Sequence, residues 1–319
     1  MLLSYLNYLP ADVTHNVAHM VLRLRLPMVG IRYVNPVELG PLKLMNPLGL
    51  GAGLDKDGYL AKTIARLGLG FITVGSVTLR PRSGNPRPRV VKYPQFKAMA
   101  NSMGLPSRGI ADLSTRLSGI VDHLHRLGVA LIVNVAGFTE GEFVEAMHIL
   151  NRFNIDGVEI NISSPTYRGY WFTDTGRLLT LMREASSASR RMTLIKLPLG
   201  LDPSTYRVIV AEANRLGLGL TIANTLPIKE PRLSTGYGGL SGLPIYPLVK
   251  ALIAKARSWG FENPIIGLGG VFNGRQALEL LKVGANAVSI VTAFAYEGPL
   301  AVVRILRELR AGWGGPNDT

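Results

Sequence analysis

The chain has 319 residues, 47% of them hydrophobic, which suffices for one large closed α/β barrel or for two smaller domains. It contains no cysteine, so disulfides, thiolate metal sites and a cysteine nucleophile are excluded, and we assign no metal. The net charge of +14 fits a nucleic acid, an anionic substrate, a phosphorylated cofactor, an acidic membrane surface, or simply a solvated basic surface. Sparse aromatic residues and the lack of a nucleic-acid motif disfavour nucleic acid as a partner.

No apolar run is long enough to span a membrane, and no signal-peptide pattern opens the chain. We therefore expect a cytoplasmic protein. Residues 1–40 form a separate N-terminal segment. Asp12 is a candidate N-cap, and apolar residues recur at helical spacing from Val13 to Leu24, with Arg23 and Arg25 on or near the other side. This helix either packs on the core or touches an anionic membrane surface as a small amphipathic extension.

From residue 41 to the end, apolar runs typical of strands alternate with amphipathic helical stretches. The eight strand candidates are Pro47–Gly51, Phe71–Gly75, Leu131–Val135, Gly157–Ile160, Thr193–Leu197, Leu220–Ala223, Pro264–Leu268 and Ala287–Val291. The helical patterns are Asp57–Leu67, Arg108–Leu127, Glu140–Phe153, Gly176–Arg191, Pro203–Leu216, Pro244–Trp259, Gly274–Val283 and Tyr296–Arg310. Eight such units predict an α/β fold, a (β/α)₈ TIM barrel over residues 41–319, with a doubly wound open sheet as the alternative.

Two connections are long. About 30 residues separate Phe71–Gly75 from the next helix, and their Pro and Gly content predicts a hairpin excursion over the barrel mouth. Residues Ser163–Asp174 carry four aromatic side chains and have the length of a lid. Both segments leave the carboxyl ends of strands, where barrels of this type hold their ligands.

Polar residues follow most of the predicted strands. Asn161-Ile-Ser-Ser-Pro165 could be a turn sequence, but it also places a hydroxyl pair beside a strand-end amide. Ser76, Asn134, Lys196, Asn224, Thr225 and Thr292 close other strands, and Lys56 follows the glycines after the first. Lys196 stands in an apolar run, so it needs an anionic or hydrogen-bonding partner. Together these residues predict a polar ring around one mouth.

Glycine-rich loops follow the first and seventh strands, at Gly51-Ala-Gly53 and Gly267-Leu-Gly-Gly270. The loops after the seventh and eighth strands form the usual phosphate site of such barrels. A flat phosphorylated cofactor, flavin mononucleotide (FMN), fits this arrangement, with a lysine near the N1 side of its ring to stabilise the anionic reduced form. The alternative is a barrel without redox chemistry that binds a phosphorylated metabolite and uses Lys196 as a Schiff-base residue.

Several motifs resemble, in order, those of the dihydroorotate dehydrogenase family: residues 46–58, 75–78, 101–104, 161–165, 238–242 and 264–270. The resemblance implies an FMN barrel that oxidises dihydroorotate to orotate in de novo pyrimidine biosynthesis. A serine at the base position and the N-terminal extension are similar to the membrane-associated, quinone-using class, in which the extension lines a quinone tunnel. The resemblance to this class also implies peripheral association with the inner face of the cell membrane.

By the same resemblance, Ser164 is the catalytic base. The substrate would be held by Lys56, Asn101, Met103, Gly104, Asn161, Asn224 and Thr225. The FMN would be held by Ala52, Gly53, Ser76, Asn134, Asn161, Lys196, Gly242, Gly270 and Thr292.

The chain departs from the family pattern on the substrate side. Thr166 stands where the family has asparagine, and Leu105-Pro106 replaces Phe-Asn. Two amides and one phenyl ring are thus missing, although Arg168 could supply a carboxylate contact. Another dihydropyrimidine or an enoate-like compound therefore stays open as the substrate.

Overall fold

The computed structural model describes residues 30–167 and 169–312. The eight expected strands are present and form one closed parallel barrel, which confirms the predicted architecture. The strands follow the ring in chain order: β3 (Leu48–Leu50), β4 (Phe71–Thr78), β7 (Ala130–Ala136), β8 (Gly157–Asn161), β9 (Met192–Leu197), β10 (Gly219–Ile222), β13 (Ile265–Leu268) and β14 (Ala287–Ile290). Their residues are nearly all buried, because barrel strands face side chains inside and helices outside.

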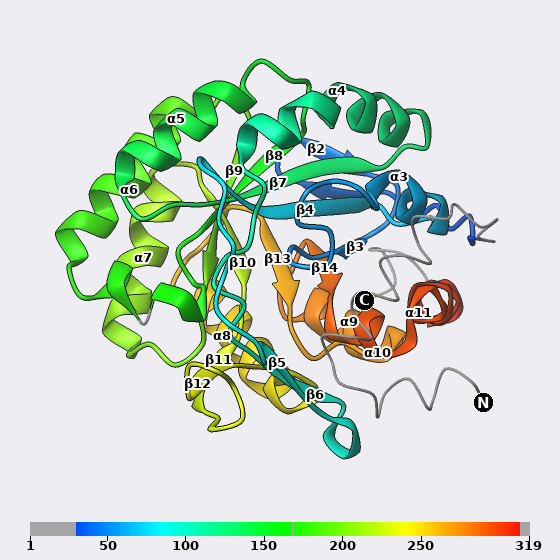
Figure 1. Ribbon diagram of the computed structural model, residues 1–319. Helices are drawn as coiled ribbons and strands as arrows, with labels where there is room; N and C mark the ends of the chain where they lie inside the picture. Colours follow the sequence, from blue (N-terminus) through cyan, green and yellow to red (C-terminus); the bar gives the residue numbers. More distant parts are fainter. Residues whose placement is uncertain (1–29, 168, 313–319) are drawn as a thin grey trace.

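The helices form an outer ring around these strands (Figure 1). They are α3 (Ala61–Ile64) with the 3₁₀ turn η2 (Ala65–Leu67), α4 (Ile110–Arg126), α5 (Glu140–Leu150), α6 (Thr175–Ala188), α7 (Pro203–Arg215), α8 (Tyr246–Ser258), α9 (Gly274–Lys282), α10 (Thr292–Glu297) and α11 (Pro299–Gly312). A 3₁₀ turn, η6 (Leu243–Ile245), precedes α8.

Two helices differ from the expectation. The first begins at Ala61 rather than Asp57, because Gly58 has a φ of +76° and cannot continue a right-handed helix. The last helical stretch begins earlier, at Thr292, and is broken at Gly298, whose φ is +62°. The first change leaves Lys56 and Gly58 in a loop after β3, at the mouth of the barrel.

A hairpin that the sequence did not predict closes the opposite end of the barrel. It consists of β1 (Val37–Leu39) and β2 (Leu42–Leu44), paired antiparallel, and the expected domain boundary at residue 40 falls in its turn. Leu39 and Leu44 pack with Phe71, Ile132 and Leu194 in a fully buried apolar cluster at the base. The hairpin therefore seals the end away from the candidate site.

A second sheet of four strands lies outside the barrel, in the order β11-β12-β6-β5. The long connection after β4 supplies β5 (Val90–Tyr93), the 3₁₀ turn η3 (Pro94–Phe96) and β6 (Ala98–Asn101), as the predicted hairpin. The connection after β10 adds β11 (Leu226–Lys229) and β12 (Tyr237–Gly242), which the sequence did not predict. The antiparallel pairing of β12 with β6 sets Gly239 opposite Asn101.

The expected helix around residues 12–24 lies outside the described residues. Among residues 30–167 and 169–312, no helix has both the length and the hydropathy needed to cross a membrane.

Candidate active site

A cavity of about 1240 Å³, including its solvent-open part, lies at the carboxyl ends of the barrel strands. All but three of the residues singled out in the sequence line it. They are Ala52, Gly53, Lys56, Ser76, Asn101, Met103, Asn161, Ser164, Lys196, Asn224, Thr225, Gly270 and Thr292. The barrel thus brings together polar groups from chain positions more than 200 residues apart, in a space large enough for a small-molecule ligand.

Three predicted residues do not line the cavity. Asn134 is fully buried on β7, Gly104 follows Met103 in the loop after β6, and Gly242 ends β12 with a φ of +98°. A side chain at Gly242 would meet the carbonyl oxygen of Lys97 at 2.2 Å, so this glycine is needed for the turn itself. Its neighbour Ser241 lines the cavity instead.

The sequence reading also missed several lining residues. Three apolar ones lie inside the quoted motifs: Leu54, Pro165 and Leu268. The other apolar residues lie outside those motifs: Val90, Met99, Leu105, Ala223, Ile245, Val271, Ile290, Val291 and Ala295. Gly269, Ser241 and Ser289 complete the lining. Ser241 belongs to the quoted stretch 238–242 and could have been found there, since its hydroxyl accepts a hydrogen bond from Thr292 Oγ1 at 3.1 Å.

Ser164 lies just beyond β8 and is only partly buried, so its hydroxyl can meet a ligand in the cavity. Its Oγ accepts a hydrogen bond from the backbone N–H of Thr166 at 3.3 Å. An N–H directed at this oxygen stabilises negative charge that develops on it. Ser164 is therefore placed to take a proton from a ligand.

The neighbouring groups on β8 are held in fixed orientations. Asn161 Nδ2 donates to Ser76 Oγ at 2.8 Å, and its Oδ1 accepts from the Ser163 hydroxyl at 3.0 Å. Asn224 Nδ2 donates to the Ser163 carbonyl oxygen at 3.1 Å. Ser163, which does not line the cavity, thus links the two asparagines that do.

The second sheet brings further polar groups over this centre. Asn101 Nδ2 donates to the Gly239 carbonyl oxygen at 3.4 Å across the β6–β12 pair. A Cβ at Gly239 would lie 1.9 Å from Thr225 Oγ1 and 2.7 Å from Pro165 Cγ. Glycine at this position therefore lets the sheet approach the loops that carry Ser164 and Thr225.

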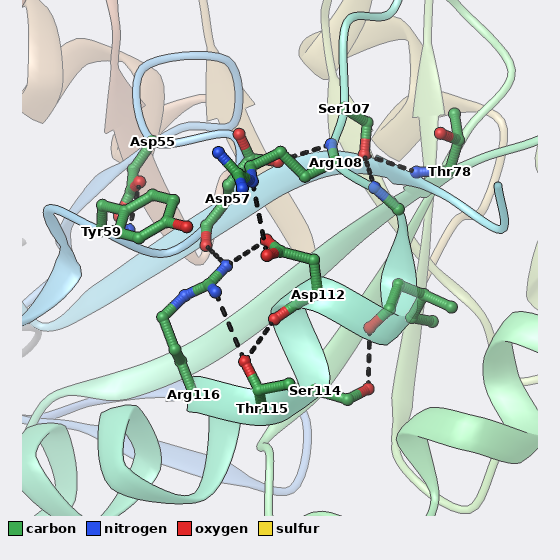
Figure 2. Close-up of polar contacts among 12 residues, drawn as sticks. Asp55, Asp57, Tyr59, Thr78, Ser107, Arg108, Asp112, Ser114, Thr115 and Arg116 are labelled. Atoms are coloured by element: carbon green, nitrogen blue, oxygen red, sulfur yellow. Dashed lines mark hydrogen bonds and ion pairs between the residues drawn. The ribbon is translucent and has the colours of Figure 1, made fainter. Parts of the chain in front are cut away.

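Lys56 is carried by the loop between β3 and α3, which is tied down at several points. The backbone N–H of Gly53 donates to the Gly75 carbonyl at 2.7 Å, and that of Gly75 donates to the Asp55 carbonyl at 2.9 Å. Figure 2 shows the Arg116 guanidinium between the Asp57 backbone and the Asp112 carboxylate, at 2.7 Å and 2.6 Å. The start of α4 thus fastens the far side of the loop.

The charge of Lys56 is sensitive to pH. Burial lowers its pKa to about 8; Asp57 opposes this shift, whereas Lys196 and Arg89 add to it. Lys56 is therefore a cation at neutral pH and becomes neutral in a mildly alkaline solution. As a cation in the cavity it can bind an anionic group of a ligand.

Asp55 is the buried anchor of the Lys56 loop. Its carboxylate accepts the backbone N–H groups of Tyr59, Leu60 and Ala61 at 2.9, 2.9 and 2.7 Å. Burial is the main reason that its pKa is raised to about 6, since these three donors act in the opposite direction. The carboxylate thus caps α3 and fixes the chain directly after Lys56.

Asp55→Asn should lower the free energy of unfolding by about 2 kcal/mol, because an amide has one acceptor oxygen where the carboxylate has two, so its NH₂ would face at least one backbone donor. Chemical denaturation at pH 7.5 measures this. Asp57→Asn is the matched control, because an asparagine can still accept from the Arg108 N–H, 3.0 Å away in the wild type. An equal loss in both variants would contradict the role given to Asp55.

Lys196 has the partner that the sequence required. Its Nζ lies 3.3 Å from Glu159 Oε1, and both side chains are almost fully buried. Glu159 Oε1 also accepts from Asn134 Nδ2 at 2.5 Å, and Oε2 accepts from Thr221 Oγ1 at 2.5 Å. The sequence reading did not identify Glu159, which lies inside an apolar run.

The segment expected to be a lid folds into two 3₁₀ turns, η4 (Pro165–Tyr167) and η5 (Tyr170–Phe172). Tyr167 and Trp171 are buried, and Trp171 packs edge-to-face on Phe143 of α5 at 5.6 Å. Of the described residues in this segment, Ser164 and Pro165 line the cavity. Tyr167 and Trp171 thus anchor the segment, whereas Tyr170 is exposed, and Arg168 lies outside the described residues.

The closed barrel with a polar mouth defines the class of protein, a barrel enzyme with its site at the strand ends. Among residues 30–167 and 169–312, no group of three or more histidine, aspartate or glutamate side chains could hold a metal ion.

Comparison with known proteins narrows this class. A family model described as "Dihydroorotate dehydrogenase" matches residues 36–312. "Dihydroorotate dehydrogenase (quinone)" of Acidithiobacillus ferrooxidans is 33% identical over 85% of this chain and 80% of its own length. The mitochondrial protein of that name from Mus musculus is 33% identical over 95% of this chain and 83% of its own. The chain belongs to the dihydroorotate dehydrogenase family.

The solved structures agree with this assignment. A ligand-free DHODH from Eimeria tenella superposes with a TM-score of 0.85 at 25% identity, covering 93% of this chain and 95% of the other. The structure of the same Eimeria protein in complex with ferulenol gives a TM-score of 0.85 at 26% identity, covering 93% and 90%.

Proposed function

We propose that this protein oxidises dihydroorotate to orotate with a bound FMN and passes the electrons to a quinone, as a step of de novo pyrimidine biosynthesis. The observation that carries the proposal is the position of Ser164, whose hydroxyl opens into a cavity shared with Lys56 and Lys196. Curated relatives named as quinone-dependent dihydroorotate dehydrogenases support the substrate and the acceptor.

The residues at the mouth fit FMN. Among the described residues, the buried Asn134 Oδ1 has no hydrogen-bond partner, as expected if a ring N–H of the ligand supplies the missing donor. Gly269 and Gly270 have φ values of +127° and +75°, and a Cβ at Gly270 would lie 2.5 Å from that of Tyr246. Only glycine therefore allows this loop beside the cavity.

The first turn of α10 lies on the same side, where Thr292 and Ser241 offer hydroxyls. Together with Ala52, Gly53, Ser76 and the Gly270 loop, these residues would hold the ring and the phosphate. When bound, FMN accepts the hydride that leaves C6 of dihydroorotate.

Ser164 removes the proton from C5 of the substrate. Its Oγ faces the cavity and accepts from the Thr166 N–H, which stabilises the oxygen as it gives up its own proton to solvent. Lys56 binds the substrate carboxylate, and Asn101, Asn224 and Thr225 hydrogen-bond the pyrimidine edge. Leu105 and Pro165 add apolar walls on this side of the cavity.

Orotate should bind less tightly as the pH rises through about 8, because the lowered pKa of Lys56 makes the ammonium lose its proton there. Below this pH the cation faces the carboxylate; above it the amine is neutral and the attraction is lost, at about tenfold in affinity per pH unit. Flavin absorbance titrations with orotate between pH 6 and 10 measure this. Lys56→Met should bind orotate weakly and without this pH dependence; the same dependence in the variant would contradict the assignment.

Residues 1–40 are proposed to lead the quinone to the cofactor and to place the protein on the inner face of the cell membrane. The helical pattern from Val13 to Leu24 and its arginines support both roles.

Turnover with a panel of substrates and acceptors tests the proposed function. Dihydroorotate with a short-chain quinone should give orotate at a higher kcat/KM than dihydrouracil, dihydrothymine or an enoate. Fumarate and NAD⁺ should be poor acceptors. Faster turnover of another dihydropyrimidine would identify a different substrate. Thr166 and Leu105 are the positions at which the chain departs from the family pattern on the substrate side.

The non-redox alternative has less support. A Schiff-base lysine attacks with a free amine nitrogen, whereas the Nζ of Lys196 is bonded to the buried Glu159 carboxylate at 3.3 Å. A colourless protein that borohydride traps with a phosphorylated carbonyl substrate would favour this alternative.

A further inference from the structure

Four polar side chains from four successive strands form a cluster in the barrel interior. They are Asn134 of β7, Glu159 of β8, Lys196 of β9 and Thr221 of β10. Lys196 reaches the cavity, whereas Glu159 lies behind it and does not line the cavity. The carboxylate stands at the centre, because each of the other three groups donates a hydrogen bond to it.

The cluster is costly to bury. The side chains of Glu159 and Lys196 are 3% and 4% exposed, and removing two charges from water costs several kcal/mol per ion before their attraction offsets it. Apolar residues of similar volume would fill this layer at least as stably. Stability alone therefore does not explain the carboxylate, and its contact with Lys196, which lines the cavity, suggests a functional role.

The carboxylate also determines how Asn134 is oriented. Because Nδ2 donates to Glu159 Oε1 at 2.5 Å, the amide oxygen is turned away from the carboxylate. That oxygen is buried and has no partner among the described residues. The proposed FMN would direct a ring N–H at this oxygen. Without the acceptor at Glu159, the Asn134 amide could rotate and present its own NH₂ to that N–H, so that two donors would face each other.

We infer that Glu159 is a positioning residue, which orients Lys196 and Asn134 toward the flavin ring and whose negative charge limits how readily the bound flavin is reduced. The inference rests on the proposed FMN site. Lys196 attracts electron density onto the ring, and the carboxylate 3.3 Å behind it partly cancels that attraction. The pair thus sets the reduction potential, and neither charge does so alone.

Glu159→Gln removes the negative charge and keeps nearly the same side-chain shape. Its amide oxygen can still accept from Asn134 and Lys196, and the Thr221 hydroxyl can turn to accept from the new NH₂. FMN should remain bound with an affinity within about threefold of the wild type. The equilibrium constant for two-electron reduction should rise by at least about tenfold, which is a potential shift of about 30 mV.

Equilibrium redox titration against dyes of known potential measures this shift. Thr221→Val is the matched control, because it removes one hydrogen bond to Glu159 and leaves the charges unchanged. It should leave the reduction constant within about twofold of the wild type. A Glu159→Gln protein that binds FMN with an unchanged or lower potential would overturn the inference.

Two further variants complete the test. Glu159→Leu removes the acceptor of Asn134 as well, so the apoprotein should bind FMN at least about tenfold more weakly by flavin fluorescence. If Glu159→Gln does not fold, Lys196→Gln and the double variant Glu159→Gln/Lys196→Gln replace it. The double variant should have the higher reduction constant of the two, and equal constants would overturn the inference.

Failure of the proposed function has a different signature. A wild-type protein that binds no FMN would remove the proposed cofactor itself. A wild-type protein that binds FMN, together with a Glu159→Gln potential that does not rise, would remove only the role of Glu159.

Discussion

Ser164→Ala should keep its FMN but reduce it with dihydroorotate about 10²- to 10⁴-fold more slowly near neutral pH. The methyl group cannot take the C5 proton, and the adjacent hydroxyl of Ser163 cannot replace it, because Ser163 does not line the cavity and is bonded to Asn161 and Asn224. Anaerobic stopped-flow absorbance measures the reduction rate directly.

Two further variants make this result specific to the proton acceptor. Ser164→Cys should recover part of the rate that Ser164→Ala loses, because a thiolate can also accept the proton. The pH dependence of its flavin reduction rate should move to the pH at which the thiolate forms. Ser163→Ala should weaken substrate binding through the two asparagines and change the reduction rate at saturating substrate much less. Unchanged reduction in Ser164→Ala would remove the base assignment.

Phe71→Ala should lower the free energy of unfolding by about 3–5 kcal/mol, the largest stability loss that we expect from a single side chain. Phe71 is fully buried at the base of the barrel, in the cluster with Leu39 and Leu44 of the closing hairpin. A Cβ on Gly49 would lie 2.3 Å from its ring, so the neighbouring strand is built around it. Truncation leaves a cavity that this rigid layer cannot fill.

Urea denaturation of the FMN-loaded protein measures the effect, and Phe96→Ala is the matched control. Phe96 is 58% exposed, so its truncation should cost about 0.5 kcal/mol or less. Comparable losses in the two variants would show that the base hairpin does not close a tightly packed core.

The barrel was predictable because its strands are buried on both faces. Runs such as Pro264–Leu268 are continuously apolar and are separated by helical patterns of a dozen residues, a combination that few folds share. The polar residues at the strand ends were equally predictable. A side chain such as Asn161 or Thr225 at the end of such a run must face the mouth, whatever its partners are.

The remaining features depend on contacts between distant residues. Strands β1, β2 and β11 have only three or four residues, too few for a period-2 pattern, and they form because the barrel base and the edge of β12 accept them. In the sequence, Glu159 only interrupts an apolar run. Its role depends on its contact with Lys196, which lies 37 positions later in the chain. The cavity wall at Leu105 and Val291 consists of ordinary apolar residues with no chemical signature.

The most direct test of the central claim is anaerobic titration of the purified protein with dihydroorotate, followed by a quinone. We predict a yellow protein whose flavin absorbance is bleached as orotate appears in equal amount, and restored when the quinone is added. A flavin that dithionite reduces but dihydroorotate leaves oxidised would contradict the proposed reaction, and a preparation without flavin would contradict the proposed cofactor as well.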